Sequence, residues 1–277
     1  MKNKLLSQGV PLILTVVVFF ILSFALYLLI LFLNEFSHTD ILTKIKIEDV
    51  LVGVTIYIKT SVDFAILIGN LMAKYNGWKN RVAIEIGTAF GNALGTMIVL
   101  ILWNIFRSIE WLLVLMIIIA AFVLLKLAEE GLEHAKETDS SFPLWAQKWI
   151  NTYDKILRSI NSSLSPILRY IIPNLSMKPK LNLTFWGLFA SSFTIPFILG
   201  LDDFAGYVPL FSIVNVFGFA IGVFAGHMLL NLALFISPNR TIKIVKNAFI
   251  SLIGSIVFVG LAVWGFYEAF KILLGAH

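Results

Sequence analysis

The sequence predicts an all-α membrane protein that crosses the bilayer several times. Of its 277 residues 59% are hydrophobic and only 13% are charged, whereas a soluble domain carries about 25% charged residues. The apolar runs match the roughly 20 residues that a helix needs to cross a bilayer, and they are far longer than the roughly ten-residue alternating strands of a membrane barrel. We therefore expect a polytopic helical protein.

Seven apolar runs are long enough to be transmembrane helices. In chain order they cover residues 10–33, 49–73, 82–106, 111–128, 184–209, 211–236 and 247–271. The first run exceeds the apolar core of a signal peptide, about 7–15 residues, and lacks a small-residue cleavage site. We expect it to be a retained helix.

The charged residues of the loops predict the orientation. The net charge is +5, and with a cytoplasmic N-terminus most of the Lys and Arg residues of the short loops fall on the cytoplasmic side, as the positive-inside rule requires. We expect the C-terminus outside. Because the basic residues are spread through short loops rather than gathered on one face, we expect no nucleic-acid partner. The chain has no cysteine, which excludes disulfides and thiolate metal sites.

Two short motifs recur in the two halves of the chain. Asp63 and Asp203 each begin an Asp-Phe-Ala triplet, and in the helix that follows each triplet two glycines four residues apart precede Asn92 or His227. The matched glycines are Gly87 and Gly91 in the first half and Gly222 and Gly226 in the second. Three spans per copy is an odd number, so the second copy would enter the membrane in the opposite sense, as in many secondary transporters.

These observations predict four parts. They are an extra N-terminal helix with its outer loop (1–48), a first three-helix repeat (49–128), a cytoplasmic linker (129–182) and a second three-helix repeat (183–277). In the linker, Trp149, Tyr153, Ile156, Leu157 and Ile160 recur at helical spacing. This pattern indicates an amphipathic helix in the membrane interface, interrupted near Ser165 and Pro166; a regulatory lid is the alternative.

The candidate site residues are the polar side chains within the spans. An ionisable group there costs at least about 2.5–3.5 kcal/mol on insertion scales, so each is a functional hypothesis. Two facing acidic residues can hold a partly dehydrated cation. We expect the fifth span to be broken near its aspartates, which follow Pro196 and Gly200 and precede Gly206 and Pro209. The candidate metal ligands are Asp63, Asp203, Asp202, His227 and Asn92.

Lys59 and Glu85 are candidates for gating or proton coupling. Lys59 precedes Asp63 by four residues, so on one continuous helix the two side chains would share a face and could pair. For Glu85, pairing with Lys79 or Arg81 at the cytoplasmic helix end is the structural alternative. For Lys59 the alternative is a snorkelling lysine.

A second acidic group ends the fourth span. Glu129, Glu130, Glu133, His134, Glu137 and Asp139 lie there. Glu130 and His134 have a spacing that helical metal sites use, but we favour a solvated helix end. Enzyme signatures such as His-Glu-x-x-His, the Walker A loop and the Gly-x-Ser-x-Gly elbow are missing from the sequence, so we do not expect an enzyme.

Two segments resemble a known family. GLDDFAGYVPLF, from Gly200 to Phe211, resembles the cadmium-resistance transporter family, and TSVDFAILIGNL, from Thr60 to Leu71, resembles the first motif of that family and of the tellurium-resistance integral membrane proteins. Both belong with the lysine exporter superfamily. The resemblance covers about residues 50–270 and implies an inverted three-plus-three arrangement.

The resemblance implies that Asp63 and Asp203 match the aspartates that hold the cation in this family. It also implies a protein of the plasma (inner) membrane of a prokaryote. The sequence departs from the family pattern because Asp202 replaces a small residue and Phe64 and Phe204 stand where Asn is common. These departures leave the metal open. Without cysteine, oxygen and imidazole ligands suit Mn²⁺, Ca²⁺ or Mg²⁺.

We therefore expect an exporter that exchanges a divalent cation, Mn²⁺-like with Cd²⁺ or Ca²⁺ as alternatives, for protons. Its partners would be this cation, protons and the lipid bilayer, with a homodimer as one assembly to test and no further cofactor. Two alternatives stay open. One is an exporter of small organic solutes such as basic amino acids, and the other is a membrane scaffold that transports nothing.

Overall fold

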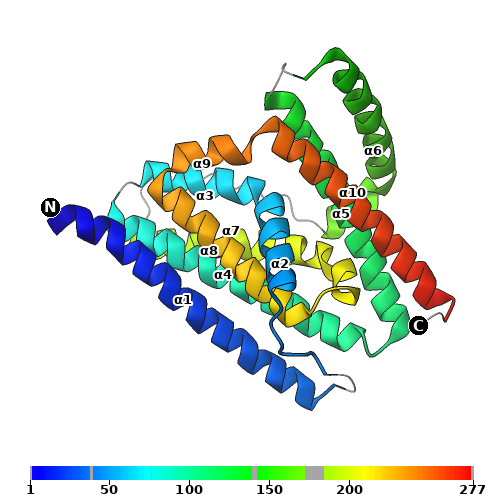
Figure 1. Cartoon of the computed structure of the whole chain (residues 1–277), viewed down its shortest axis with the longest axis horizontal. Helices are drawn as coiled ribbons and strands as arrows, with labels where there is room; N and C mark the ends of the chain where they lie inside the picture. Colours follow the sequence, from blue (N-terminus) through cyan, green and yellow to red (C-terminus); the bar gives the residue numbers. More distant parts are fainter. Residues whose placement is uncertain (1, 38–39, 76, 139–141, 172–183, 276–277) are drawn as a thin grey trace. The chain divides into compact units, whose positions relative to one another are not determined.

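The described part of the chain is entirely helical. The computed structural model describes residues 2–37, 40–75, 77–138, 142–171 and 184–275, without the side chains of 2–8, 11, 134–138, 144–146, 164–171 and 199–206. Within these residues there is no strand (Figure 1), which confirms the all-α prediction. The elements are α1 (Lys2–Glu35), α2 (Ile47–Thr60), α3 (Val62–Lys74), α4 (Trp78–Phe106), α5 (Glu110–Thr138), α6 (Leu144–Ile171), α7 (Phe185–Gly206), η1 (Val208–Ser212), α8 (Val216–Ile236), α9 (Pro238–Val245) and α10 (Ala248–Leu273).

Several of these helices could cross a membrane. Five described segments are long and apolar enough: Leu12–Glu35, Trp78–Phe106, Glu110–Glu133, Val216–Ile236 and Ala248–Leu273. The pair α2 and α3 would make a sixth if it is one bent span. The predicted span 184–209 lies on α7, whose described apolar part is the shorter Phe185–Ile198. A multi-pass membrane protein is thus supported, and the count of seven stays a prediction.

The predicted helix 49–73 is not one helix. α2 ends at Thr60, α3 begins at Val62, and the two axes differ by 67°. Ser61 lies at the bend and is 1% exposed. Ser61 keeps both of its own backbone hydrogen bonds, because its N–H donates to Tyr57 O at 3.0 Å and its carbonyl oxygen accepts from Ala65 N–H at 2.9 Å.

The break predicted near the aspartates of the fifth span falls on their C-terminal side. α7 contains Pro196 and stays helical through Asp203 to Gly206. The 3-10 helix η1 follows, and α8 begins only at Val216 instead of residue 211. The second half is thus interrupted at Gly206, three residues after Asp203, and the first half is interrupted at Ser61, two residues before Asp63.

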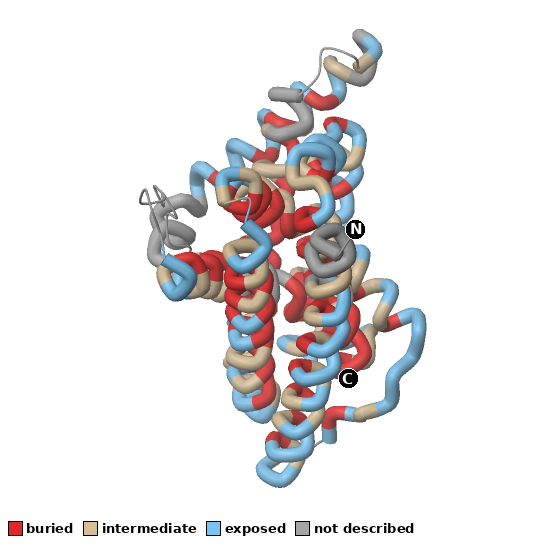
Figure 2. The backbone as a smooth tube through the Cα atoms, turned by 90° about the vertical axis from the view of Figure 1, so that its left-hand side faces the viewer, coloured by how far each residue is buried: buried red, intermediate tan, exposed pale blue. Residues whose placement is uncertain are grey.

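The chain divides into two compact units, which we describe separately. Unit 1 comprises Met1–Ser108, Lys178–Phe204 and Ile213–Lys243, and unit 2 comprises Ile109–Met177, Ala205–Ser212 and Ile244–His277. In unit 1, α1, α4 and α8 contact one another, and α2 packs along α8 (Figure 1). Figure 2 shows that helices such as these bury one side and expose the other.

Glycines allow two helix pairs of unit 1 to approach closely. A Cβ on Gly222 of α8 would overlap the Val50 carbonyl oxygen of α2, and a Cβ on Gly53 of α2 would overlap the Phe219 carbonyl oxygen of α8. Between α4 and α7, a Cβ on Gly91 would overlap the Phe193 carbonyl oxygen. Small residues at such crossings are typical of membrane helix packing.

In unit 2, α5 and α10 pack together and α6 covers part of them. The core of this unit includes Leu124 and Ala128 of α5, Phe258 of α10, and Ile150 and Leu157 of α6. α6 is one continuous helix to Ile171. The interruption predicted at Ser165 and Pro166 is therefore wrong, and Leu157, which we expected in the membrane interface, is 2% exposed and packs against protein.

Candidate functional site

A row of polar side chains runs along the buried face of α4. Glu85, Thr88, Asn92 and Thr96 are separated by three, four and four residues, so they lie on one helical face. Their exposed fractions are 2%, 0%, 3% and 1%. Polar groups at such depth in a candidate span require a specific reason, and this row is the strongest functional candidate among the described side chains.

A hydrogen-bonded chain connects this row to α8 and α2. Asn231 of α8 donates through Nδ2 to Thr88 Oγ1 at 2.8 Å and faces His227 Nε2 at 3.0 Å. His227 Nδ1 lies 2.6 Å from the Tyr57 hydroxyl of α2. His227 and Asn231 are both 0% exposed. Three helices thus share one polar network inside unit 1.

The network assigns the proton of the imidazole. Thr88 Oγ1 donates to the Glu85 carbonyl oxygen at 2.9 Å, so its only hydrogen is used. Asn231 Nδ2 then supplies one hydrogen to Thr88 and one to His227 Nε2, which must accept. The remaining ring proton lies on Nδ1 and is donated to the Tyr57 oxygen. With both nitrogens engaged, His227 holds helices together in this structure and does not present a lone pair to a metal.

Glu85 has a partner that its sequence neighbourhood did not suggest. Thr15 of α1 donates to Glu85 Oε1, while Oε2 is buried with no hydrogen-bond partner among the described residues. The expected pairing with Arg81 is wrong, since Arg81 donates to the Phe235 carbonyl oxygen at 2.9 Å and its guanidinium lies 5.4 Å from the Phe235 ring centroid. The alternative partner, Lys79, stacks on its neighbouring Trp at 5.7 Å.

Two further buried polar atoms beside the row have unused hydrogen-bonding capacity. Asn231 Oδ1 and Thr96 Oγ1 are buried without a partner in the described part of the chain. Buried polar atoms are almost always satisfied by protein or by water.

Lys59 and Asp63 flank the bend between α2 and α3. Lys59 lies in the last turn of α2 and Asp63 in the first turn of α3, so each charge complements the dipole of its own helix. Because the helices diverge by 67°, the premise that these residues share one helical face is wrong. Asp63 is exposed and Lys59 half-buried.

The first acidic motif nevertheless reaches the network. Phe64, the neighbour of Asp63, is buried, and its ring centroid lies 5.2 Å from that of His227. Asp202 and Asp203 belong to helical backbone, but their side chains lie outside the described residues. Of the predicted ligands, the structure therefore places His227 and Asn92 on buried faces of α8 and α4, and Asp63 on the exposed side of the bend.

The described residues contain no group of three or more His, Cys, Asp or Glu side chains that could hold a metal ion. Sequence reasoning also missed Thr15, Tyr57, Thr88 and Asn231, although the spacing of Thr88 from Glu85 and of Asn231 from His227, three and four residues, was available as a signal. Thr15 and Tyr57 belong to distant helices, and no local pattern indicates them.

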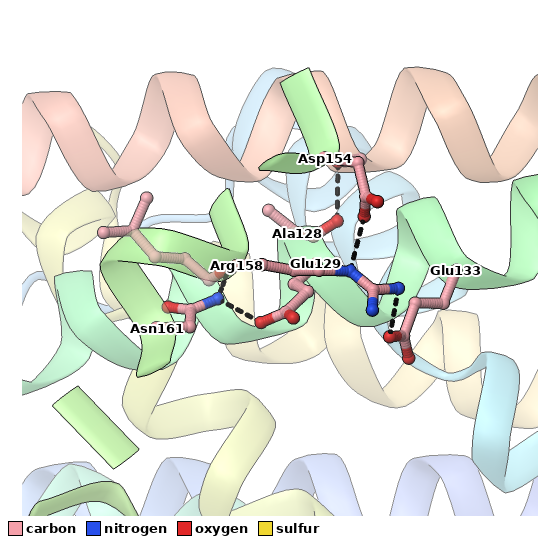
Figure 3. Close-up of polar contacts among 8 residues, drawn as sticks. Ala128, Glu129, Glu133, Asp154, Arg158 and Asn161 are labelled. Carbon is pink, nitrogen blue, oxygen red and sulfur yellow. Dashed lines mark hydrogen bonds and ion pairs between the residues drawn. The ribbon is translucent and has the colours of Figure 1, made fainter. Parts of the chain in front are cut away.

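A second polar cluster fastens α6 to α5 within unit 2 (Figure 3). Arg158 donates to Asp154 at 3.0 Å and to Glu133 at 2.9 Å, and Asn161 donates to Glu129 at 2.6 Å and to the Leu125 carbonyl oxygen at 3.1 Å. Glu129 and Glu133 therefore bind α6, a role that the sequence did not indicate, while the side chains of Glu130 and Glu133 remain 38% and 45% exposed, as a solvated helix end requires. The His134, Glu137 and Asp139 side chains lie outside the described residues.

No protein-family model, curated protein or solved structure matches this chain.

Proposed function

We propose that this protein is a secondary transporter that exports a divalent cation in exchange for protons across a prokaryotic plasma membrane. The observation that carries the proposal is Glu85, a carboxyl group 2% exposed within a candidate span and facing a row of buried polar side chains. Burying a carboxyl group within a membrane span costs free energy, and a scaffold that transports nothing has no need of it.

The contact between Glu85 and Thr15 suits a carboxyl group that gains and loses a proton. A hydroxyl is both a donor and an acceptor. Thr15 donates to the carboxylate and could accept from the carboxylic acid without leaving its place. We assign Glu85 to proton coupling, which makes α1 part of the transport unit instead of a peripheral addition.

The bend beside Asp63 supports a cation site in the first acidic motif. Discontinuous helices expose backbone carbonyl groups and helix ends, and secondary transporters bind ions at such breaks. In the proposal Asp63 and Asp203, with Asp202 beside the latter, alternate between metal-bound and protonated states. We assign Asn92, which is buried on α4, as a further ligand of this cation, and Lys59 at the end of α2 as the gate.

The glycine contacts support two inverted repeats. In the proposed repeat Gly222 matches Gly87, and α2 matches α7. Gly222 of α8 approaches the Val50 carbonyl group of α2, and Gly87 of α4 approaches the Phe189 carbonyl group of α7, where a Cβ would lie 2.6 Å from the oxygen. The second helix of each copy, α4 or α8, therefore packs on the first helix of the other copy, α7 or α2. Two inverted repeats that interlock would produce this arrangement.

The test is proton exchange by purified protein in liposomes that contain a pH-sensitive dye, challenged separately with Mn²⁺, Ca²⁺, Cd²⁺ and Mg²⁺. We expect one cation to move protons in the wild type and not in Asp63→Asn, Asp203→Asn or Glu85→Gln. Glu48→Gln, which neutralises an exposed carboxyl group in the first turn of α2, is the matched control. Unchanged exchange in both aspartate variants would overturn the cation site, and a response of folded protein only to lysine or arginine would favour the organic-solute exporter.

A further inference from the structure

Helix α6 carries two different apolar faces. Ile150 and Leu157 are 3% and 2% exposed and pack in the core of unit 2. Trp149, Ile156 and Ile160 are 51%, 55% and 38% exposed. The second set is spaced by seven and four residues, so it forms a single stripe. We call these three residues the outer stripe of α6.

The outer stripe is flanked by exposed basic residues. Lys148 and Lys155, each adjacent in sequence to a residue of the stripe, are both exposed. Tyr153, half-buried between the two faces, stacks on Trp149 with ring centroids 5.3 Å apart. Aromatic side chains beside lysines are typical of helices that bind at the boundary between water and lipid.

The attachment points place α6 at the ends of two candidate spans. Asn161 and Arg158 bind residues 125–133 of α5, the last turns of the span Glu110–Glu133. On α10, the Tyr153 hydroxyl donates to the Ser255 carbonyl oxygen at 3.2 Å, two turns from the start of that helix at Ala248. The outer stripe is therefore held at the depth where a span leaves the hydrocarbon.

We propose that the outer stripe binds the surface of the lipid bilayer and that Lys148 and Lys155 contact anionic headgroups. The lysines give this surface the charge complementary to an anionic leaflet, which attracts basic residues that lie near its surface. A second copy of the chain fits less well. Even an aromatic side chain buries only about 150–250 Å², so three side chains fall short of the roughly 800 Å² per partner of a stable protein interface.

This assignment is independent of the proposed transport and makes α6 a lipid-binding helix whose inner face is fastened to α5. The contacts of Arg158 and Asn161 hold the helix to the protein, and the outer stripe would hold it to the membrane. A change in leaflet charge would therefore act directly on the element that contacts the ends of α5 and α10.

Single cysteine variants test the inference directly, because the chain contains no cysteine of its own. Ile156→Cys and Ile160→Cys place a spin label on the outer stripe, and Asn151→Cys places it on the exposed polar side of the same helix as the control. The full-length protein in nanodiscs is then examined for collisions of each label with oxygen, which concentrates in lipid, and with a nickel chelate, which stays in water.

We expect the ratio of oxygen to nickel collisions to be several-fold higher at residues 156 and 160 than at 151. Adding phosphatidylglycerol to phosphatidylcholine discs should raise the ratio further, and Lys148→Gln together with Lys155→Gln should abolish that increase. Equal ratios at the stripe and at the control would overturn the proposal. Spin–spin broadening at residue 156 between copies would instead identify a second chain as the occupant.

Discussion

The Tyr57 hydroxyl lies 2.6 Å from His227 Nδ1, although 170 positions separate the two residues. This hydrogen bond joins α2 to α8 in the same helix pair that Gly53 and Gly222 bring into close contact. The ring centroids of Tyr57 and His227 are 5.6 Å apart and nearly perpendicular. A residue that looked like a metal ligand in the sequence thus connects the two halves of the chain.

Replacing His227 should destabilise unit 1. In His227→Leu the hydrogen bonds of His227 to the Tyr57 hydroxyl and to the Asn231 amide would be lost in a buried environment, and a buried hydrogen bond that is left unmade costs about 1–3 kcal/mol. We expect a clearly lower thermal midpoint in detergent for His227→Leu and a smaller decrease for Tyr57→Phe, which removes the hydroxyl alone. The control is Leu229→Ala, an exposed position on the same helix. Equal midpoints for His227→Leu and the control would contradict the assigned network.

Alanine at the crossing glycines should also destabilise the protein. Gly91→Ala and Gly222→Ala each place a methyl group against a backbone carbonyl of another helix, which cannot rotate away. Gly260→Ala on α10 is the matched control, since a Cβ there meets nothing within 4 Å and the higher helix propensity of Ala gains up to about 1 kcal/mol. Thermal unfolding should therefore give lower midpoints for Gly91→Ala and Gly222→Ala than for the wild type. The midpoint of Gly260→Ala should equal that of the wild type or exceed it. An unchanged midpoint in Gly222→Ala would mean that α2 and α8 lie further apart.

The sequence predicted helix positions well wherever an apolar run ended in polar residues. The runs 82–106 and 247–271 correspond to α4, Trp78–Phe106, and α10, Ala248–Leu273. The bend at Ser61 was not predicted, because the local residues include no proline and the polar residues Lys59 and Asp63 were interpreted as a site within one helix. Pro196 suggested a break in α7 that the helix accommodates instead.

The site was predicted only in part for a similar reason. Burial of Glu85 and Asn92 follows from their place in an apolar run, and the structure gives both buried positions. Their partners come from other helices, however, and local spacing favoured Arg81 for Glu85 where the fold supplies Thr15. The repeat and the cation site remain predictions.

Removing Asn161 should release α6 more than removing Arg158. Asn161 is buried and donates to both Glu129 and Leu125, whereas the Arg158 side chain is 53% exposed, and exposed ion pairs contribute little. We expect hydrogen exchange of residues 150–161 to accelerate markedly in Asn161→Ala and slightly in Arg158→Ala, with Ser163→Ala as the exposed control on α6. Faster exchange in Arg158→Ala than in Asn161→Ala would contradict the prediction and make the ion pairs of Arg158 the stronger attachment of α6.

Alkaline conditions should not release α6 through Arg158. The hydrogen bond that Arg158 donates to Asp154, followed by the negative charge of that carboxylate, raises the pKa of Arg158 above its ordinary value. A group whose pKa is higher in the folded than in the unfolded protein stabilises the fold at any pH below its unfolded-state pKa. This stabilisation is lost only as the pH rises through its folded-state pKa. Since both values lie above any pH that the protein tolerates, exchange of residues 150–161, corrected for its intrinsic pH dependence, should be the same at neutral and mildly alkaline pH. A selective loss of protection in that range would contradict the prediction.

The pairing of Thr15 with Glu85 separates a transport role from a structural one. Thr15→Ser keeps the hydroxyl that donates to Glu85, whereas Thr15→Val keeps the shape of the side chain and removes the donor. If Glu85 couples protons, cation-driven proton exchange in liposomes should be near normal in Thr15→Ser, strongly reduced in Thr15→Val and absent in Glu85→Gln. Glu85→Gln should unfold at a midpoint no lower than the wild type, because a neutral amide costs less to bury than a carboxylate. Normal exchange with a lowered midpoint in Glu85→Gln would instead identify the carboxyl group as a purely structural partner of α1.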